Sequence, residues 1–404
     1  MTTDPHPLTV VGIGADGWDG LTGPARAALT AAEAVLGSDR QLAMLPATVA
    51  ARRVPWPSPL LPALPGLLAD HRGRTLCVLA SGDPMWHGIG ATLVRHAGAD
   101  AVRVLPHPSS ASLAAARLGW PLADTDVLSL VTAPVEELHP LVHPGRRILV
   151  LGRDGTTAAQ VAALLTARGY GDSPLTVLSQ LGGPAEHALT GAAGTWSHLD
   201  TDPLTVIAVE CRGAGRPVPC VPGLPDEAYD TDGQLTKREV RAVTLAVLGP
   251  QPGELLWDVG AGSGSIGIEW MRTHRACRAV AVESSAERAA RIRANAAALG
   301  TPALRVVHGR APDALADLSA PDAVFIGGGL TRDGVLDTCL AALRAGGRLV
   351  ANAVTVESEA VLAAWYARLG GELTRVAVSR GAPVGGFTGW RTMMPVTIWS
   401  VTKP

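Results

Sequence analysis

Short apolar runs alternate with longer amphipathic stretches along most of the chain, and this order is typical of α/β proteins. A strand buried on both faces is almost continuously apolar, whereas a helix that covers a sheet is apolar on one side only. We therefore expect strands at residues 8–14, 74–80, 101–105, 147–151, 175–178, 204–211, 255–257, 279–282, 303–308, 323–326 and 348–352. Helices are expected at residues 90–97, 110–118, 156–169, 286–299, 332–345 and 357–369. The pattern predicts repeated βα units.

A stretch rich in proline and glycine, residues 212–233, interrupts this alternation. Proline fixes φ and has no backbone N–H, so the stretch cannot form a regular element. A chain of 404 residues is also too long for one typical core. We therefore predict domains at residues 1–211 and 234–404, joined by a semi-rigid linker at 212–233.

Three further segments carry local expectations. Residues 372–379 and 394–401 are apolar enough to close the chain as a hairpin-like strand pair, and residues 381–386 are expected to be a flexible loop between them. The proline-rich residues 54–59 are likewise expected to be a loop.

The most informative segment is Asp258–Ser265, which follows an apolar run and precedes an amphipathic one. It predicts a strand, a glycine turn and a helix, and the glycines allow a ligand close to the backbone while the helix directs free N–H groups at it. Glu283 ends the next strand, where a carboxylate can accept hydrogen bonds from both hydroxyls of a ribose. The spacing predicts a nucleoside-binding βαβ unit. A site for S-adenosylmethionine (SAM), a nicotinamide dinucleotide site and an ordinary glycine turn remain open.

Composition narrows the class of protein. Hydrophobic residues make up 47% of the chain and charged residues 17%, as in a folded globular protein. A net charge of −2 and an aromatic content of 4% argue against a general nucleic-acid binder. No apolar run approaches the roughly 18 residues of a membrane span, and residues 1–7 do not begin a signal peptide pattern. The scattered cysteines predict neither a zinc site nor another metal site; they indicate reduced thiols in a cytoplasmic protein.

The glycine turn differs from the dinucleotide pattern G-x-G-x-x-G and resembles the first motif of the class I SAM methyltransferases, which share a seven-stranded Rossmann-like sheet. The resemblance implies that SAM is the cofactor and places adenine beside residues 306–311. It also places Asp322 near the methyl-transfer centre. The implied SAM-binding residues are Thr236, Asp258, Gly260, Ala261, Gly262, Ser263, Gly264, Glu283, Gly309 and Ala311.

The first domain resembles the tetrapyrrole (corrin and porphyrin) methylases, a class III SAM methyltransferase family. The resemblance is carried, in order, by residues 11–14, 79–88, 105–110 and 178–186. It implies that the turns containing Gly12, Gly14, Gly82, Asp83, Ser109 and Ser110 hold a SAM molecule. The chain departs from the family pattern at His87, at His107-Pro108 and at residues 129–133.

The fusion of two such domains is similar to the decarboxylating precorrin methyltransferases of the aerobic cobalamin pathway. That resemblance implies two C-methylations of a tetrapyrrole, at carbons 5 and 15, with loss of carbon dioxide from the acetate at carbon 12. It places carbon-15 methylation and decarboxylation in the second domain and carbon-5 methylation in the first. It also implies self-association as a dimer or tetramer.

The implied substrate is a polyanion, which requires arginines because their planar fork binds carboxylates in pairs. Arg380 and Arg310 are the leading candidates because each is expected to follow a strand of the second domain. Lys237, Arg238 and Arg391 are further candidates. Any of these residues taken singly is more often a solvated surface charge, and Glu269, His274 and His308 are interpreted as structural.

Two alternatives stay open. The second domain could methylate RNA bases, or one domain could bind SAM or a corrinoid without turnover. A local interpretation also applies to Thr236, because Thr236-Lys237-Arg238-Glu239 has the form of a capping box at a helix start.

Overall fold

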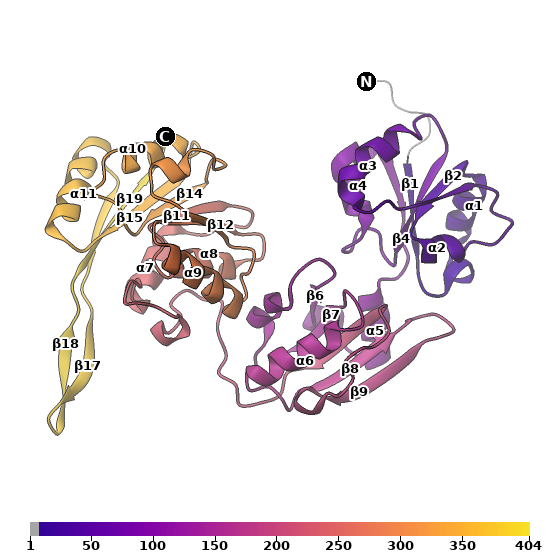
Figure 1. Cartoon of the computed structure of the whole chain (residues 1–404), viewed down its shortest axis with the longest axis horizontal. Helices are drawn as coiled ribbons and strands as arrows, with labels where there is room; N and C mark the ends of the chain where they lie inside the picture. Colours follow the sequence, from indigo (N-terminus) through magenta and orange to yellow (C-terminus); the bar gives the residue numbers. More distant parts are fainter. Residues whose placement is uncertain (1–7) are drawn as a thin grey trace. The chain divides into compact units, whose positions relative to one another are not determined.

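The computed structural model describes residues 8–404 as two compact units, so the N-terminal residues 1–7 lie outside the described part (Figure 1). The first unit comprises the described part of residues 1–135 together with His143–Arg216. The second unit comprises Glu136–Val142 and Pro217–Pro404. No helix of residues 8–404 combines the length and the apolar character needed to cross a membrane.

The first unit contains two five-stranded sheets. The first sheet is parallel with strand order β3-β2-β4-β1-β5. Its strands are β1 (Leu8–Ile13), β2 (Ala34–Gly37), β3 (Arg52–Pro55), β4 (Leu76–Ser81) and β5 (Val102–Leu105). Its helices are α1 (Gly23–Ala31), α2 (Asp39–Ala43), α3 (Leu60–Ala69) and α4 (Ile89–Ala97). The carboxyl ends of β1, β4 and β5 therefore meet at one edge of this sheet.

The second sheet of the first unit has strand order β6-β7-β10-β8-β9 and is mixed, because only β6 and β7 are parallel. Its strands are β6 (Asp126–Ser129), β7 (Arg147–Leu151), β8 (Pro174–Ser179), β9 (His187–Ala192) and β10 (Thr205–Glu210). The associated helices are α5 (Ser110–Leu118) and α6 (Thr157–Ala167). Small alanines of α5, Ala111, Ala114 and Ala115, pack against β7, β8 and β10.

The second unit is built on a seven-stranded sheet of order β13-β12-β11-β14-β15-β19-β16, in which only β19 and its neighbours pair antiparallel. Its strands are β11 (Leu255–Val259), β12 (Arg278–Glu283), β13 (Arg305–His308), β14 (Ala323–Ile326), β15 (Arg348–Ala353), β16 (Glu372–Val376) and β19 (Val396–Thr402). The order reverses at β11, and sheets of this kind bind ligands beyond the carboxyl ends of the strands at such a point. This sheet is the class I methyltransferase arrangement that the sequence predicted.

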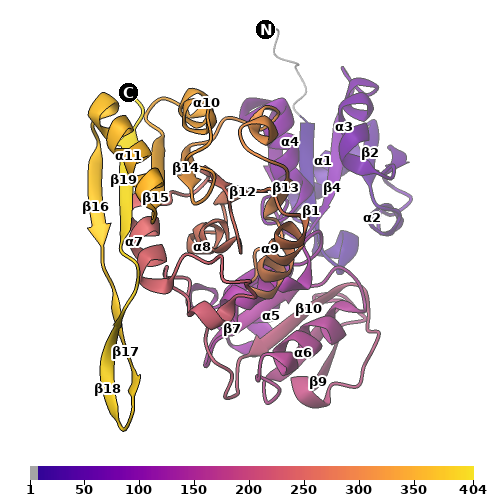
Figure 2. The ribbon, with the colours of Figure 1, turned by 60° about the vertical axis from the view of Figure 1, so that its left-hand side comes forward.

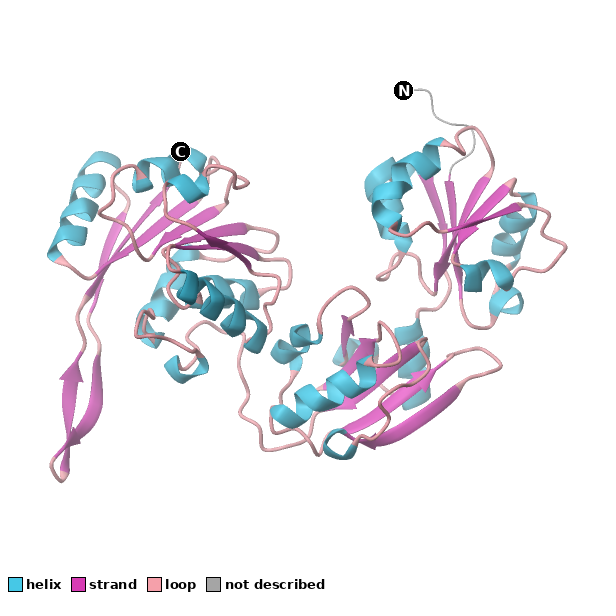
Figure 3. Cartoon of the chain, viewed as in Figure 1, coloured by secondary structure: helices cyan, strands magenta, loops and turns pink. Residues whose placement is uncertain are grey.

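Helices cover both faces of this sheet (Figure 3). They are α7 (Arg238–Leu248), α8 (Ser265–Thr273), α9 (Ala286–Ala298), α10 (Val335–Ala342) and α11 (Val356–Leu369). Side chains of β11 alternate between two cores: Leu256 packs with α7, α8 and α9, and Trp257 packs with α10 and α11. Because successive strand residues point to opposite faces, the continuous apolar run of β11 fills both cores.

A two-stranded hairpin of β17 (Ser379–Val384) and β18 (Phe387–Thr392) extends away from the seven-stranded sheet of its unit (Figures 1 and 2). The expectation of a flexible loop at residues 381–386 is therefore wrong. The turn Gly385-Gly386 lies between the paired residues Val384 and Phe387, and two adjacent glycines favour a tight hairpin turn.

Two other expectations are corrected by the fold. Of the loop expected at residues 54–59, residues 54 and 55 are instead the end of β3, where Pro55 is tolerated because β3 is an edge strand, and residues 56–59 form neither helix nor strand, as expected. In the proline-rich segment, Leu224 and Tyr229 are buried in the core of the second unit, and residues 226–228 form a short 3-10 helix. The later part of this segment is therefore packed structure.

Candidate functional site

The glycine turn of the second unit lies at the carboxyl end of β11, where the sequence placed it. The backbone N–H groups of Gly260 and Ala261 both donate to the carbonyl of Val282 on β12, at 2.9 and 3.2 Å. The Glu283 carboxylate accepts from the N–H of Gly262 at 3.0 Å and from the N–H of Ser285 at 2.9 Å. The turn and the acidic residue are thus fixed to each other before any ligand binds.

The glycines of the turn are required by both conformation and space. Gly260, Gly262 and Gly264 have φ of +69°, +59° and +78°, a region that L-residues rarely adopt. A Cβ on Gly260 would lie 2.5 Å from the Cα of Gly328, and one on Gly262 would lie 2.8 Å from the carbonyl oxygen of Gln234. The loop after β14 and the segment before α7 therefore reach the turn directly.

Asp258 is a buried acidic residue of β11 that precedes the glycine turn. It is 1% exposed, its Oδ2 accepts from the N–H of Gly267 at 2.9 Å, and its Oδ1 is buried and has no hydrogen-bond partner within residues 8–404. Burial, with a smaller contribution from the charge of Glu283, raises the pKa of Asp258 from 3.8 to about 7. A buried carboxylate oxygen without a partner is costly, so this atom is suited to a cationic or hydrogen-bond-donating ligand.

This shift predicts a pH effect on stability. Between pH 3.8 and about 7 the folded state keeps a proton that the unfolded state has lost, so the free energy of unfolding falls as pH rises through that window. Asp258→Asn removes the titration and should be more stable than the parent at pH 8, by up to roughly 4 kcal/mol. Urea unfolding at a series of pH values measures the difference, which should vanish below pH 4. A difference independent of pH would contradict the assignment.

Gly309 and Ala311 lie just after β13, and the N–H of Gly309 donates to the carbonyl of Glu283 at 2.9 Å. A cavity of about 460 Å³ opens here, lined by Arg305, Val307, His308, Gly309, Arg310, Asp313, Ala314, Asp317 and Leu318. Arg310 is exposed on this cavity. Arg310 thus shares this cavity with Gly309, whose N–H is bonded to Glu283.

The expected position of Asp322 is wrong. Asp322 precedes β14, at the opposite edge of the sheet from the glycine turn, and its carboxylate accepts from the N–H of Leu255 at 2.8 Å and from Arg344 at 2.6 Å. It ties the amino ends of β11 and β14 together. The apolar run was assigned correctly to a strand, but Asp322 lies at its beginning rather than its end.

Arg380 is also not where the sequence placed it. It lies in the hairpin strand β17, pairs across the hairpin with Arg391, and its Nη2 contacts Asp226 at 3.2 Å and Glu239 at 2.5 Å. These ion pairs raise the pKa of Arg380 and show that its charge is already compensated. Arg380 therefore fastens the base of the hairpin.

The expected capping box at Thr236 does not form. Helix α7 begins at Arg238, its cap residue Lys237 makes no side-chain cap, and Glu239 is engaged by Arg380. Instead, the carbonyl oxygen of Thr236 accepts from Arg241 at 2.5 Å. Lys237 and Arg238 lie in the segment whose residue Gln234 accepts a hydrogen bond from Ser263 of the glycine turn.

A buried polar cluster around Glu269 and Arg241 packs beneath the start of α7, and the sequence did not indicate that these charges are buried. Glu269, on α8, accepts from the N–H groups of Gly223 and Leu224, from the hydroxyl of Tyr229 and from Nε of Arg241. Arg241 is fully buried. Glu269 is structural, as expected, although it is buried beneath the site and not on a helix surface. Ser263, at the turn, donates to the carbonyl of Gln234 at 2.6 Å.

The first unit brings its own predicted residues together at the carboxyl edge of its first sheet. Gly82 follows β4 and its N–H donates to the carbonyl of Ile13 at 3.0 Å, and a Cβ on Gly12 would collide with the carbonyl oxygen of Gly82. A Cβ on Gly82 would lie 3.3 Å from the Cα of Ser109. Three turns, after β1, β4 and β5, therefore abut one another.

The remaining residues of this edge stabilise the turns. Asp83 accepts from the N–H of Met85 at 2.8 Å, and Ser109 caps α5, which begins at Ser110, by accepting from the N–H of Ser112 at 3.0 Å. His107 contacts Asp16 at 3.1 Å and lies under Gly14, where a Cβ would approach its ring to 2.7 Å. The His107–Asp16 pair was not foreseen, although the departure at His107 marked the position.

The fourth motif of the first unit comes from the second sheet of that unit. Gln180 adopts φ of +53°, and a Cβ on Gly183 would lie 2.7 Å from the carbonyl oxygen of Ala15. A non-glycine residue in the left-handed region is held by its surroundings and is typical of a functional turn. Segments far apart in the sequence thus converge on the turn after β1.

Comparison with known proteins agrees with the division of the chain into two different methyltransferase domains. Residues 227–403 match the family of precorrin methyltransferase domains, and residues 7–196 match the tetrapyrrole (corrin/porphyrin) methylases. A protein of Mycobacterium tuberculosis named precorrin-6Y C(5,15)-methyltransferase (decarboxylating) is 52% identical over 399 residues, which cover 98% of this chain and 100% of that protein. A protein of the same name from a Sinorhizobium species is 48% identical over 398 residues, covering 98% and 96%.

Among solved structures, the crystal structure of the C-terminal domain of the precorrin-6Y C5,15-methyltransferase from Rhodobacter capsulatus matches with 45% identity and a TM-score of 0.43. It covers 46% of this chain and 99% of that one. With both halves matched and full-length relatives at about half identity, the chain belongs to the family of decarboxylating precorrin-6Y C(5,15)-methyltransferases.

Proposed function

We propose that this protein transfers methyl groups from SAM to carbons 5 and 15 of precorrin-6Y and removes the carboxyl group of the acetate at carbon 12, giving precorrin-8X in aerobic cobalamin biosynthesis. The observation that carries the proposal is the presence, in one chain of this family, of two separate glycine-lined turns, each at the carboxyl ends of parallel strands in its own sheet. Each turn is suited to one SAM molecule.

The residues of the second unit fit the chemistry of SAM. The buried Oδ1 of Asp258, to which no group of the described residues donates, favours a cationic ligand, and the positive φ of Gly260 and Gly262 leaves backbone where side chains would intrude. Glu283 stands at the end of β12 for a ribose. SAM, when bound, supplies a methyl group on a positively charged sulfur. The chain holds and orients that group, with Asp258, Gly260, Ala261, Gly262, Ser263, Gly264, Glu283, Gly309 and Ala311 as the proposed binding residues and Thr236 beside them.

In the first unit, we assign the same task to the turns of Gly12, Gly14, Gly82, Asp83, Ser109 and Ser110. Backbone groups predominate there, as suits a zwitterion that must be held without collision. Methylation of an electron-rich ring carbon needs little acid–base assistance; it needs the carbon, methyl and sulfur in line and water kept out. By family resemblance, carbon-5 methylation belongs to the first unit and carbon-15 methylation to the second.

Decarboxylation is assigned to the second unit. The bond between the acetate methylene and its carboxyl carbon breaks, carbon dioxide leaves, and the electron pair moves into a protonated ring imine of the substrate. The protein must bind the other carboxylates of the substrate while it removes the hydration shell from the carboxylate that leaves. Arg310 is placed for such a contact, because it is exposed on the cavity beside Gly309.

The test is incubation of the full chain with SAM and precorrin-6Y, followed by mass spectrometry. We expect a gain of two methyl groups and a loss of one carbon dioxide, and calorimetry with SAM should give two sites per chain. Methylation of tRNA in place of the tetrapyrrole, or binding of a nicotinamide dinucleotide at the glycine turn, would overturn the proposal. A unit that transfers no methyl group in this assay would instead have a scaffold role.

We also propose that the chain self-associates through the hairpin β17–β18. Its exposed apolar side chains are Val384, Phe387, Trp390 and, just beyond it, Met394. No charged residue lies between Gly381 and Trp390, so two copies can approach without like-charge repulsion. A two-stranded hairpin is marginally stable alone in water, and a second copy would cover it.

The free thiols of the five cysteines are compatible with a cytoplasmic enzyme.

Replacing Phe387 and Trp390 by serine is expected to shift the full chain to a lower oligomeric state, because most of the exposed aromatic surface of the hairpin is removed. Light scattering after size-exclusion chromatography measures the mass. Leu199→Ser, at a position 78% exposed in the first unit, is the control and should leave the mass unchanged. A parent protein that is already monomeric would refute self-association.

A further inference from the structure

Arg40 lies at the cofactor edge of the first unit and takes no part in the site described above. It is on α2, and its Nη2 donates to the hydroxyl of Ser81 at 3.3 Å, at the carboxyl end of β4. Gln41 donates to the same hydroxyl at 3.1 Å. The Nη1 of Arg40 is buried and has no hydrogen-bond partner among the described residues. The guanidinium therefore has unused donors next to the Gly82 turn.

The charge of Arg40 is also poorly compensated. Burial lowers its pKa, and only Asp202 acts in the opposite direction. The carboxylate of Asp202 is already engaged, since it accepts from Nε2 of Gln180 at 2.9 and 3.0 Å and from the N–H of Leu204 at 2.7 Å. A partly buried guanidinium with a free donor favours an anion, and its planar fork suits a carboxylate.

An exposed aromatic surface follows on the same loop. Met85 and Trp86 are each 46% exposed, immediately after the Gly82 turn. The loop is not loose: the N–H of Trp86 donates to the carbonyl of Asp83 at 3.1 Å, and a Cβ on Gly88 would lie 2.6 Å from the carbonyl oxygen of Pro84. The apolar surface is thus presented by a constrained backbone.

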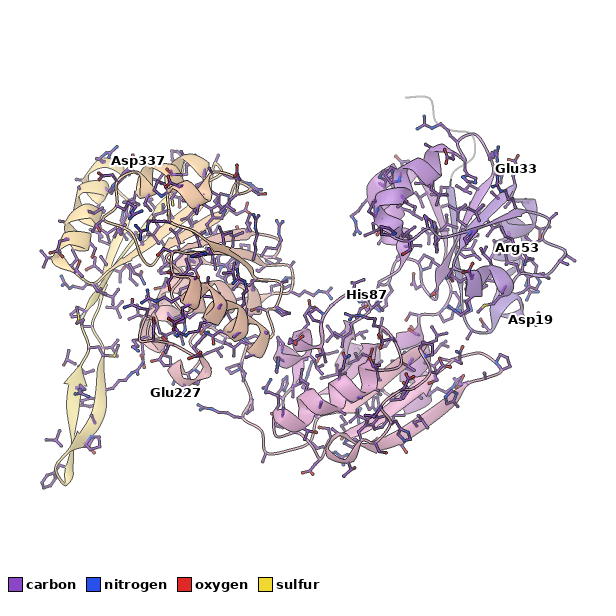
Figure 4. The ribbon with its side chains drawn as sticks, viewed as in Figure 1. Asp19, Glu33, Arg53, His87, Glu227 and Asp337 are labelled. Carbon is purple, nitrogen blue, oxygen red and sulfur yellow. The ribbon has the colours of Figure 1, made fainter. Side chains whose placement is uncertain are left out.

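His87 shows that this loop is held in an unfavourable conformation. The φ of His87, which Figure 4 labels, is +55°, and its ring meets that of Trp86 edge to face with centroids 5.4 Å apart. Strain of this kind persists where the surroundings impose it, and it is concentrated at ligand-binding loops. The contact with His87 restricts the orientation of the Trp86 ring.

We propose that Arg40 and Trp86 form a substrate subsite of the first unit, in which Arg40 binds a carboxylate arm and Trp86 packs against the face of the macrocycle. The inference rests on the proposed function, which supplies a planar polycarboxylate as substrate. Ser81, which accepts from Arg40, precedes Gly82, and Gly82 abuts the turns of Gly12 and Ser109. A ring held by this subsite would therefore lie beside the bound SAM.

The test uses the full chain with Arg40→Gln, Arg40→Lys, Trp86→Ala and Trp86→Phe. Arg40→Gln and Trp86→Ala should each raise the KM for precorrin-6Y in carbon-5 methylation by roughly tenfold or more, with the KM for SAM unchanged. Arg40→Lys should recover part of the effect, because lysine keeps the charge without the fork. Trp86→Phe should stay close to the parent. Arg52→Gln, exposed on β3, and Leu199→Ala are matched controls.

Unchanged KM values for precorrin-6Y in both Arg40→Gln and Trp86→Ala would overturn the proposal. A rise in the KM for SAM alone would overturn it as well, by assigning Arg40 to the cofactor carboxylate. If the parent transfers no methyl to carbon 5, the proposed function fails, and binding of precorrin-6Y measured by quenching of tryptophan fluorescence decides the subsite. Weaker binding in the two variants would then retain it, and parental binding would reject it.

Discussion

Gly260→Ala is expected to abolish carbon-15 methylation and decarboxylation, lowering the rate at least about a hundredfold. The φ of Gly260 is +69°, and the added Cβ would lie 2.5 Å from the Cα of Gly328. The atoms of Gly328 that this Cβ would meet are all backbone atoms, so either the glycine turn or the loop after β14 must move. Calorimetry with SAM should then show one site per chain where the parent shows two.

The matched control is Gly346→Ala. Gly346 has φ of +73°, but a Cβ there meets nothing within 4 Å. This variant bears the cost of the left-handed conformation, about 1–2 kcal/mol, without the collision. It should be less stable yet keep both SAM sites. Equal loss of SAM binding in the two variants would mean that backbone strain alone, and not the fit of the two loops, determines the site.

The second large effect is expected from Glu269→Ala, which should destabilise the second unit by about 3–5 kcal/mol. Glu269 is 1% exposed and Arg241 is fully buried, with Nε of Arg241 donating to Glu269 at 2.6 Å. Without the carboxylate, Nε of the buried Arg241 and the N–H groups of Gly223 and Leu224 lose their acceptor. Urea unfolding followed by tryptophan fluorescence reports the change, because Trp257 and Trp270 are buried in this unit.

Glu372→Ala, at an exposed position of β16, is the control and should change stability little. The double variant Arg241→Met with Glu269→Gln should cost less than the sum of its single changes, since the buried charge leaves with its partner and glutamine still accepts the backbone N–H groups. Additive effects would show that the two side chains do not stabilise each other.

The strands that carry the glycine-lined turns were the most predictable part of the fold, whereas β2 was not predicted and residues 54–55 of β3 were assigned to a loop. The run that forms β11 is apolar because both of its faces are buried, as Leu256 and Trp257 show by packing into different cores. The glycine turn could also be located from the sequence, because only glycine is tolerated at positions that combine a positive φ with no room for a Cβ. The family and its chemistry were also evident from the motifs.

The wrong predictions for charged and polar residues share a cause, because these side chains bind partners that are far away in the sequence. Thr236 and Glu239 have capping-box spacing, but Glu239 pairs with Arg380 in the hairpin. Asp322 stands at the edge of an apolar strand, and only the direction of that strand in the sheet shows which edge. For the hairpin β17–β18, a local signal was present in Gly385-Gly386 and was outweighed by the composition of the surrounding residues.

By itself, the sequence determined where the backbone must turn tightly and which segments must be buried, because those demands depend on each residue and its immediate neighbours. Only the tertiary structure decided which charges meet: that Arg380 pairs with Glu239 at the hairpin, that Glu269 compensates Arg241, and that Nη1 of Arg40 finds no acceptor in the described part of the chain. Ion pairs depend on distance in space, and residues about 30 to 140 positions apart come within hydrogen-bonding range only after the sheets have formed.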